Sequence, residues 1–265
     1  MGGIRLERDG ALAVITIDRP DKLNALTLAM YDQLGEAFAE VREDPGIGVA
    51  ILTGAGDRAF CVGADLGESI PALAEGRFDI SEWDAAHQKH SRLDKPVVAA
   101  INGLCLGGGF EIMLSTDIRV ASSAASFALP ETGVGVVPAG GTLVRLVRQI
   151  PYAFAMDLML RGERIDAATA QRYGLLNRVV APDEVESTAH ALAEELLGRS
   201  RTAVATVKRA VRELADLSYP AAFEREAELG QRAFDSDDAR EGLAAFADRR
   251  APDFPSHRVQ TATRP

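Results

Sequence analysis

The chain has 265 residues, 47% of them hydrophobic, and a mean hydropathy of −0.01. A globular chain of this length can bury a substantial core as one large domain or two smaller units. Its formal charge of −10 and its pI near 5.0 argue against nucleic acid as a bulk partner, because neutralising phosphates needs a basic surface. No stretch approaches the roughly 18 apolar residues of a membrane span, and the first ten residues lack the apolar run of a signal peptide. We therefore expect no membrane partner and a cytoplasmic location.

Short apolar runs and helical periodicity alternate along the first half of the chain. Thr27 is a suitable cap for a helix that carries Tyr31, Leu34, Phe38 and Val41 on one face. A second, polar helical segment is expected near 81–93, and a third, entered through glycines, at 107–116. Strands are expected at 11–17, 49–54, 97–101, 118–122 and 126–129. Strands separated by crossover helices imply an α/β core with a largely parallel sheet.

The second half of the chain is mainly helical. One more strand is expected at 177–181. Helices are expected at 142–150, 151–160, 166–174, 182–199, 202–217, 220–234 and 236–250. Asp166 is a suitable cap for the third of these and Gly174 a suitable stop. The last fifteen residues have the composition of a loose tail. We divide the chain into an α/β core at 1–195 and a C-terminal helical region with its tail at 196–265.

The cysteines and histidines give no sign of a disulfide framework or a metal centre. Cys61 and Cys105 lack CxxC spacing, and we expect both to be buried as small apolar side chains. His87 and His90 are three residues apart, but no third ligand is evident. We interpret the two histidines as part of a solvated helix face and predict no metal.

Three consecutive glycines, 107–109, follow the buried strand at 97–101 and open a helix. A helix entrance without Cβ atoms lets a ligand approach unpaired N–H groups and the positive end of the helix dipole, which suits an oxyanion. Glu111 lies about one turn after Gly108, so its carboxylate can reach the same space. The alternative is a packing contact between backbones, with Glu111 paired to an arginine.

Two further segments contain candidate site residues. In RAFCVGADL at 58–66, Gly63 and Ala64 leave an amide exposed after a strand, which could supply a second donor for the same oxygen. Asp65 is better explained as a residue that fixes this loop. In FALPETGVGVVPAGGT at 127–142, Glu131 lies in a glycine-rich loop, where functional groups often gather. Taken alone, Glu131 would be interpreted as a solvated glutamate.

Together, AFCVGADL, VVAAINGLCLGGGFEIMLSTDIRVAS, SFALPETGVGVVPAGGT and GLLNRVV resemble the crotonase superfamily, the enoyl-CoA hydratase/isomerase group, over nearly the whole chain. The resemblance implies a spiral of repeated ββα units and a homotrimer or hexamer built through the C-terminal helical region. It implies an acyl-CoA thioester as substrate, with no separate cofactor. It also implies an oxyanion hole formed by the amides of Ala64 and Gly108, with Glu111 and Glu131 as the two catalytic glutamates.

By this resemblance the expected activity is that of an enoyl-CoA hydratase, a hydro-lyase that adds water in the syn sense to a 2-enoyl-CoA and gives the 3-hydroxyacyl-CoA. Two neighbouring carboxylates do not both ionise cheaply, so one acts as base while the other holds a proton. We favour Glu131 as acid and Glu111 as base.

The resemblance places CoA along residues 22–26 and 64–66. The expected substrate contacts are Lys22, Ala25, Leu26, Ala64, Asp65, Leu66, Gly107 and Gly108. A solvated Lys22 is the alternative for that residue. Phe246, Arg249 and Arg250 resemble C-terminal residues that add adenine or phosphate contacts in the family.

Other functions are possible. The loop VVPAGGT, with Ala139 after Pro138, is one residue shorter than in typical hydratases and resembles a divergent group that includes carnitinyl-CoA dehydratase-like proteins. A double-bond isomerase is a second alternative within the superfamily, and an acyl-CoA-binding protein without activity is a third. A nucleotide-binding oxidoreductase would use Gly54, Gly56 and Ala59, which match GxGxxA, but no helical pattern follows this motif.

Overall fold

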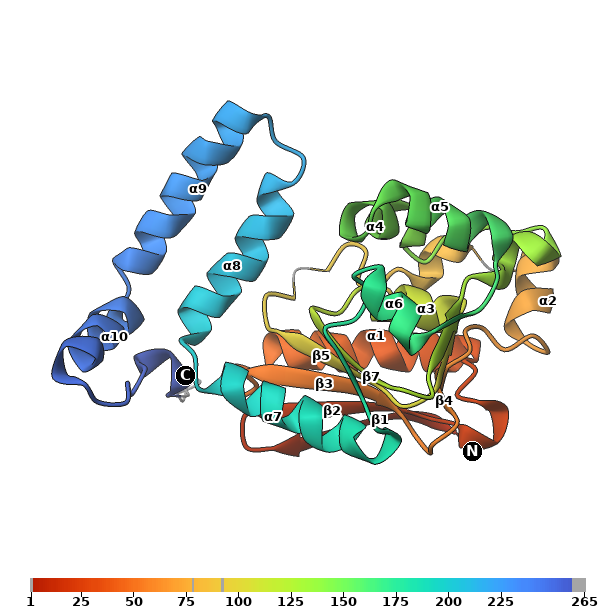
Figure 1. The fold of residues 1–265 in the computed structure, drawn as a ribbon, viewed down its shortest axis with the longest axis horizontal. Helices are drawn as coiled ribbons and strands as arrows, with labels where there is room; N and C mark the ends of the chain where they lie inside the picture. Colours follow the sequence, from red (N-terminus) through yellow and green to blue (C-terminus); the bar gives the residue numbers. More distant parts are fainter. Residues whose placement is uncertain (1, 78, 92, 259–265) are drawn as a thin grey trace.

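The computed structural model describes residues 2–77, 79–91 and 93–258 and contains two β-sheets surrounded by helices (Figure 1). The first sheet has six strands in the order β1-β2-β3-β5-β7-β10. These strands are β1 (Gly3–Asp9), β2 (Leu12–Asp18), β3 (Val49–Gly54), β5 (Val97–Ile101), β7 (Ile118–Ser122) and β10 (Arg178–Val180). Only β1 and β2 pair antiparallel within it, so the predicted, largely parallel α/β core is confirmed.

The second sheet has four short strands in the order β4-β6-β8-β9. They are β4 (Ala59–Cys61), β6 (Leu104–Leu106), β8 (Ser126–Ala128) and β9 (Ile165–Asp166). Three strands of the first sheet, β3, β5 and β7, are each followed by a strand of the second, β4, β6 and β8. The chain therefore winds from one sheet to the other in successive turns, which confirms the predicted spiral.

Helices cover the sheets and provide the core. They are α1 (Leu28–Glu43), α2 (Ser69–Ala74), α3 (Gly108–Met113), α4 (Thr142–Gln149), α5 (Tyr152–Arg161), α6 (Ala167–Arg172), α7 (Val185–Leu197), α8 (Arg201–Leu214), α9 (Tyr219–Phe234) and α10 (Asp237–Asp248). Val185, Ala189 and Ala193 of α7 pack on Ile51 and Val98 of the first sheet. The opposite face of this sheet contributes to a larger core that includes α1 and α3.

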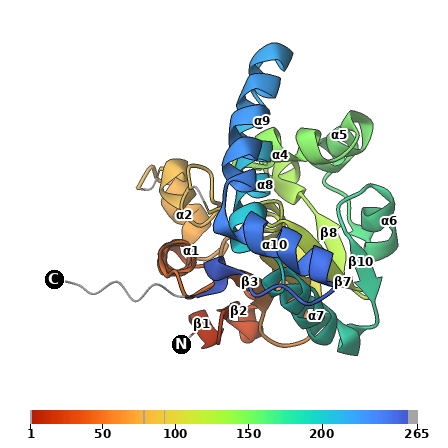
Figure 2. The ribbon, with the colours of Figure 1, turned by 90° about the vertical axis from the view of Figure 1, so that its left-hand side faces the viewer.

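The helices α8 and α9 stand away from the α/β core as a pair (Figures 1 and 2). Ion pairs connect α8 to the segments that precede β5 and β7. Arg209 and Arg212 both contact the carboxylate of Asp94, at 2.8 and 2.7 Å, and Lys208 contacts Asp117 at 2.7 Å. The four predicted C-terminal helices are confirmed as α7 to α10. Residues 259–265 of the predicted tail lie outside the described residues, and Pro255–His257 form a 3-10 turn.

Several local predictions were wrong. The segment near 81–93 contains one 3-10 turn, Ile80–Trp83, followed by irregular turns, because Gln88 adopts a left-handed backbone with φ of 53°. His87 is fully buried, and only His90 is solvated, with its side chain 85% exposed. The strand β1 was not predicted, because GIRLERD is a polar edge strand with little buried surface.

Candidate active site

Gly107 and Gly108 form the entrance of α3. Gly107 has φ of +52° and ψ of −127°, a backbone conformation that favours glycine, and it turns the chain from β6 into the helix. Gly108 is the first helical residue, so its N–H has no acceptor within α3. Gly109 lies against the β4 backbone, because a Cβ placed on it would be 2.2 Å from the carbonyl oxygen of Cys61. The triplet thus allows close packing and leaves the Gly108 amide without an acceptor in its own helix.

The amide of Ala64 faces the same place. Leu26 pairs with Ala64 in a parallel bridge, in which the Leu26 amide donates to Gly63 O at 2.8 Å and the Asp65 amide donates to Leu26 O at 2.8 Å. Because these bonds use the residues on both sides of Ala64, the Ala64 N–H points away from Leu26. A Cβ placed on Gly108 would lie 3.8 Å from the Ala64 nitrogen. The two predicted donors therefore lie side by side.

Glu111 is a buried carboxylate, only 6% exposed, on the first turn of α3. The Thr142 amide, at the start of α4, donates to its Oε1 at 3.4 Å. Burial, together with the nearby charge of Glu131, raises the pKa of Glu111 to about 7. Within the described ranges Glu111 has no ion pair, so the alternative of an arginine-paired glutamate is wrong.

Glu131 lies at the start of a 3-10 turn, Pro130–Val134, directly after β8. Its Oε1 is close to the helix entrance, since a Cβ on Gly107 would lie 3.1 Å from it. Its Oε2 is buried and has no hydrogen-bond partner among the described residues. Burial raises the pKa of Glu131 as well. The interpretation of Glu131 as an ordinary solvated glutamate is therefore wrong, and the fold brings both predicted glutamates to the glycine triplet.

Aromatic side chains form one wall beside the glutamates. The ring of Tyr31, on α1, stacks on Trp83 with centroids 4.4 Å apart, and His87 lies 5.6 Å from Tyr31 by the same measure. A Cβ on Gly108 would lie 2.8 Å from the Tyr31 hydroxyl. Burial raises the pKa of Tyr31 well above its ordinary value, and Cys61, Glu111 and Glu131 add to the effect. Tyr31 and His87 were not predicted as site residues, because both fit helical patterns on the sequence.

The segments expected to hold CoA also come together. The Leu26 and Ala64 bridge joins them, and Ala25 and Leu26 are buried while Lys22 and Leu66 are exposed. Asp65 accepts hydrogen bonds from Arg19 at 2.5 Å and from the Gly67 amide at 2.8 Å, which confirms that it fixes the loop. Arg19 holds the pKa of Asp65 below its ordinary value.

The remaining predictions concern the GxGxxA motif, the two cysteines, the C-terminal residues and metal ligands. The GxGxxA match at 54–59 runs from β3 into β4 through a turn, not into a helix, so the dinucleotide alternative is wrong. Cys61 and Cys105 are fully buried as expected. Arg250 pairs with Glu241 at 2.6 Å, and Phe246 is 84% exposed on α10. In the described part of the chain no three His, Cys, Asp or Glu side chains converge as metal ligands.

The spiral that alternates between two sheets defines the crotonase class of fold. Comparison with solved structures agrees. An enoyl-CoA hydratase from Bacillus anthracis superposes with a TM-score of 0.91 at 32% identity, over 96% of this chain and 99% of that one. An enoyl-CoA hydratase from Mycobacterium tuberculosis superposes with a TM-score of 0.86 at 34% identity, over 96% and 98% of the two chains.

Sequence comparison specifies the family. The profile of the enoyl-CoA hydratase/isomerase family matches residues 7–257, and the chain belongs to this family. A carnitinyl-CoA dehydratase of Salmonella arizonae is 39% identical over 262 residues, which cover 96% of this chain and 98% of the relative. An enoyl-CoA hydratase of Mycobacterium tuberculosis is 40% identical over 254 residues, covering 94% and 95%. Within the described residues, no helix has the length and apolar character needed to cross a bilayer.

Proposed function

We propose that this protein is an enoyl-CoA hydratase, which adds water to a 2-enoyl-CoA thioester and reverses the reaction from the 3-hydroxyacyl-CoA. The main support for the proposal is that Glu111 and Glu131 both lie beside the glycine triplet, where the amides of Ala64 and Gly108 lie side by side. Membership of the enoyl-CoA hydratase/isomerase family supports an acyl-CoA thioester as the substrate.

In the proposed reaction the thioester carbonyl oxygen accepts hydrogen bonds from the amides of Ala64 and Gly108. One glutamate takes a proton from water, the water oxygen bonds to Cβ, and the double-bond electrons move toward the carbonyl to form an enolate. The two amides stabilise the charge that develops on the oxygen, an effect worth about 2.7–4 kcal/mol per donor in comparable sites. The other glutamate then supplies the proton at Cα, and no separate cofactor takes part.

The protonation of the glutamate pair suits this reaction. Burial raises the pKa of both carboxylates, and the charge of Glu131 adds to the effect on Glu111. We therefore expect the pair to hold one proton near neutral pH, which leaves one base and one acid. The pKa of about 7 for Glu111 is well matched to general acid or base work at that pH. This pKa favours the shared proton on Glu111, so it gives no support to our preference for Glu131 as the acid. The assignment of Glu111 as base stays a prediction.

Dehydration of a specialised 3-hydroxyacyl-CoA is the second candidate function. The carnitinyl-CoA dehydratase among the relatives is as similar to this chain as the hydratases are. The loop after Glu131, with one residue fewer than in typical hydratases, resembles that group as well. Both functions use the same oxyanion hole and the same glutamates, so they differ in the acyl chain that the site accepts.

The absorbance of the conjugated enoyl-thioester tests these functions. We expect the wild type to remove this absorbance from at least one substrate in a panel of short, long, branched and aromatic 2-enoyl-CoAs. Carnitinyl-CoA, as substrate for the reverse reaction, should raise the absorbance if the specialised function holds. An isomerase would instead create absorbance from a 3-enoyl-CoA and leave 2-enoyl-CoAs unchanged, and that result would overturn the hydratase proposal.

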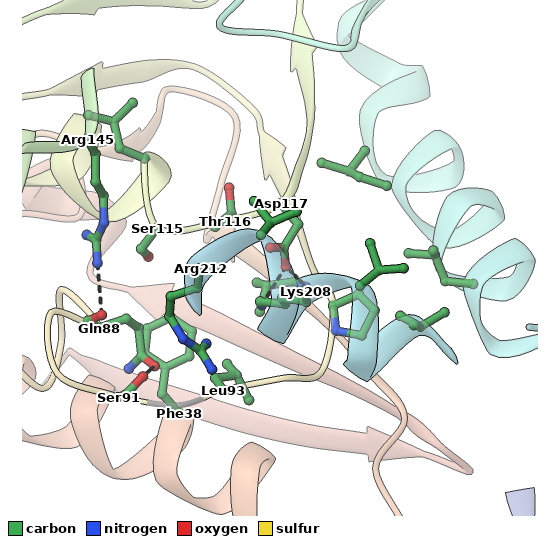
Figure 3. A pocket seen from close by; sticks show the side chains of 18 of the residues that line it. Phe38, Gln88, Ser91, Leu93, Ser115, Thr116, Asp117, Arg145, Lys208 and Arg212 are labelled. Atoms are coloured by element: carbon green, nitrogen blue, oxygen red, sulfur yellow. Dashed lines mark hydrogen bonds and ion pairs between the residues drawn. The ribbon is translucent and has the colours of Figure 1, made fainter. Parts of the chain in front are cut away.

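We also propose that the protein assembles as a homotrimer or as a hexamer of two trimers. Apolar side chains are exposed along the projecting helices, with Val211 71%, Tyr219 82%, Phe223 64% and Phe234 72% exposed. A cavity of about 810 Å³ opens between α8 and the core (Figure 3). It is lined by Leu93, Val207 and other apolar side chains, and it does not include the glutamates. Light scattering after gel filtration would contradict this proposal if it returned the mass of a single chain.

A further inference from the structure

His87 is a fully buried histidine that lies beside Glu111, across the backbone of Gly140. A Cβ placed on Gly140 would lie 2.5 Å from Nε2 of His87 and 2.6 Å from Oε2 of Glu111. The two atoms are therefore no farther apart than the sum of these distances, which a single water molecule can bridge. Nε2 has no hydrogen-bond partner among the described residues.

The protonation state of His87 follows from its contacts. Nδ1 lies 2.9 Å from the carbonyl oxygen of Trp83, which can only accept, so Nδ1 carries the hydrogen in this contact. Burial lowers the pKa of His87 to about 4, and the positive charges of Lys89 and Arg145 act in the same direction while Asp84 opposes them. The ring is therefore neutral at physiological pH, and Nε2 presents a lone pair.

The surrounding structure holds this ring in one place. Arg145, on α4, donates to the carbonyl oxygens of His87 at 2.7 Å and of Gln88 at 2.8 Å. Figure 3 shows the bond from Arg145 to Gln88. These bonds hold the turn at Gln88 in place. Gln88 has φ of 53°, in the left-handed region that residues with a side chain rarely adopt. Tyr31 and Trp83 pack around the ring, with centroids 5.6 and 6.4 Å from that of His87. A buried acceptor held rigidly without a partner costs stability, and such groups concentrate at functional sites.

We propose, resting on the hydratase function above, that His87 is a further catalytic residue whose Nε2 accepts a hydrogen bond from the attacking water and then from the product hydroxyl. Water has two O–H bonds. One breaks as its proton passes to the glutamate base, while the oxygen lone pair forms the bond to Cβ. The other O–H bond stays intact and points at Nε2 of His87, which neither gains nor loses a proton. His87 thus orients the oxygen lone pair toward Cβ.

This role applies to the addition of water and not to chemistry at Cα. Exchange of the Cα proton of a saturated acyl-CoA with solvent needs the oxyanion hole and a glutamate, but no attacking water. Loss of the acceptor on His87 should therefore slow hydration and spare exchange. A histidine that serves only to pack beside Glu111 would also slow hydration and spare exchange, because Glu131 is the group that we expect to serve Cα. That defect would not be reversed by a new acceptor at the Nε2 position, so restoring the acceptor separates the two roles.

Two substitutions separate the acceptor from the packing contact. The amide nitrogen of Asn in His87→Asn can take the place of Nδ1 and donate to the Trp83 carbonyl, but nothing replaces Nε2. The longer side chain in His87→Gln can bring its amide oxygen near the Nε2 position and restore an acceptor. His90→Asn is the matched control, because His90 is solvated on the same segment.

The experiment measures hydration of the best 2-enoyl-CoA, deuterium exchange at Cα of butyryl-CoA in D2O, and the melting temperature of each full-length protein. We expect His87→Asn to lose at least about tenfold in kcat for hydration, with exchange changed less than about threefold. His87→Gln should recover part of the hydration, and His90→Asn should match the wild type. Hydration by His87→Asn within about threefold of the wild type, an equal loss of hydration and exchange, or hydration by His87→Gln no faster than by His87→Asn, would overturn the role of His87. Failure of the wild type itself to hydrate any substrate would instead overturn the hydratase function, and this inference with it.

Discussion

Removing the charge of Glu111 should stabilise the protein at neutral and alkaline pH while it abolishes activity. The pKa of Glu111 rises from its ordinary value of 4.5 to about 7 in the folded protein, mainly through burial. Each pKa unit corresponds to about 1.4 kcal/mol, so the ionised carboxylate costs the folded state about 3 kcal/mol. Because the folded pKa is the higher one, this cost is absent below pH 4.5, grows as the pH rises, and is complete above about pH 7. Glu111→Gln removes the charge and with it the cost.

Denaturant unfolding of the wild type and Glu111→Gln at a series of pH values from 4.5 to 9 measures this effect. We expect the free energy of unfolding of the variant, relative to the wild type, to rise by about 1.4 kcal/mol per pH unit and to level off above pH 7 at about 3 kcal/mol. Glu36→Gln, on the exposed side of α1, is the control for charge alone and should show no such rise. A difference between Glu111→Gln and the wild type that does not change with pH would refute the argument.

Three further predictions follow from particular contacts. Gly109→Ala should lose about 2–4 kcal/mol of stability in denaturant unfolding, because its Cβ would meet the Cys61 carbonyl oxygen at 2.2 Å, whereas Gly133→Ala, with open space around it, should be nearly neutral. Arg119→Met should lose about 3–5 kcal/mol of stability by the same measurement, because buried acceptors would lose their donor. The Arg119 guanidinium donates to the carbonyl oxygens of Met113, Thr116 and Leu175 and to the side chain of Gln149. The kcat/KM for hydration should fall as the pH rises above about 7, because the glutamate pair then loses its shared proton; a rate that keeps rising through pH 9 would contradict the shared proton.

The parts of the fold that depend on strong local sequence patterns could be predicted from the sequence. The strands β2, β3, β5 and β7 of the first sheet could be predicted because they are short segments rich in apolar and β-branched residues, and β5 is a continuous apolar run that is buried throughout. The helix α6 could be predicted from its cap, because the Asp166 side chain accepts a hydrogen bond from the Thr169 amide three residues later. The glycine triplet likewise predicted a helix entrance with a free amide.

The strands β4, β6 and β9 of the second sheet and the aromatic wall could not be predicted in this way, whereas β8 was expected at 126–129. The strands β4 and β6 have three residues each, too short for an alternating pattern to appear. His87 comes from an irregular turn that Arg145 holds from a distant helix, so its burial depends on a long-range contact. Tyr31 fitted the apolar face of α1, and only the fold shows that its hydroxyl adjoins Gly108. Such groups are defined by tertiary packing, which periodicity in one segment does not report.

The most direct test of the central claim is to follow, in D2O, both hydration of 2-enoyl-CoAs and deuterium exchange at Cα of butyryl-CoA for the wild type, Glu111→Gln and Glu131→Gln. We predict that the wild type performs both reactions and that each variant loses hydration by several orders of magnitude. One variant should keep exchange, and our preference for Glu131 as the group that serves Cα predicts that it is Glu111→Gln. A folded wild type that binds acyl-CoA but performs neither reaction, or variants that hydrate as well as the wild type, would contradict the account.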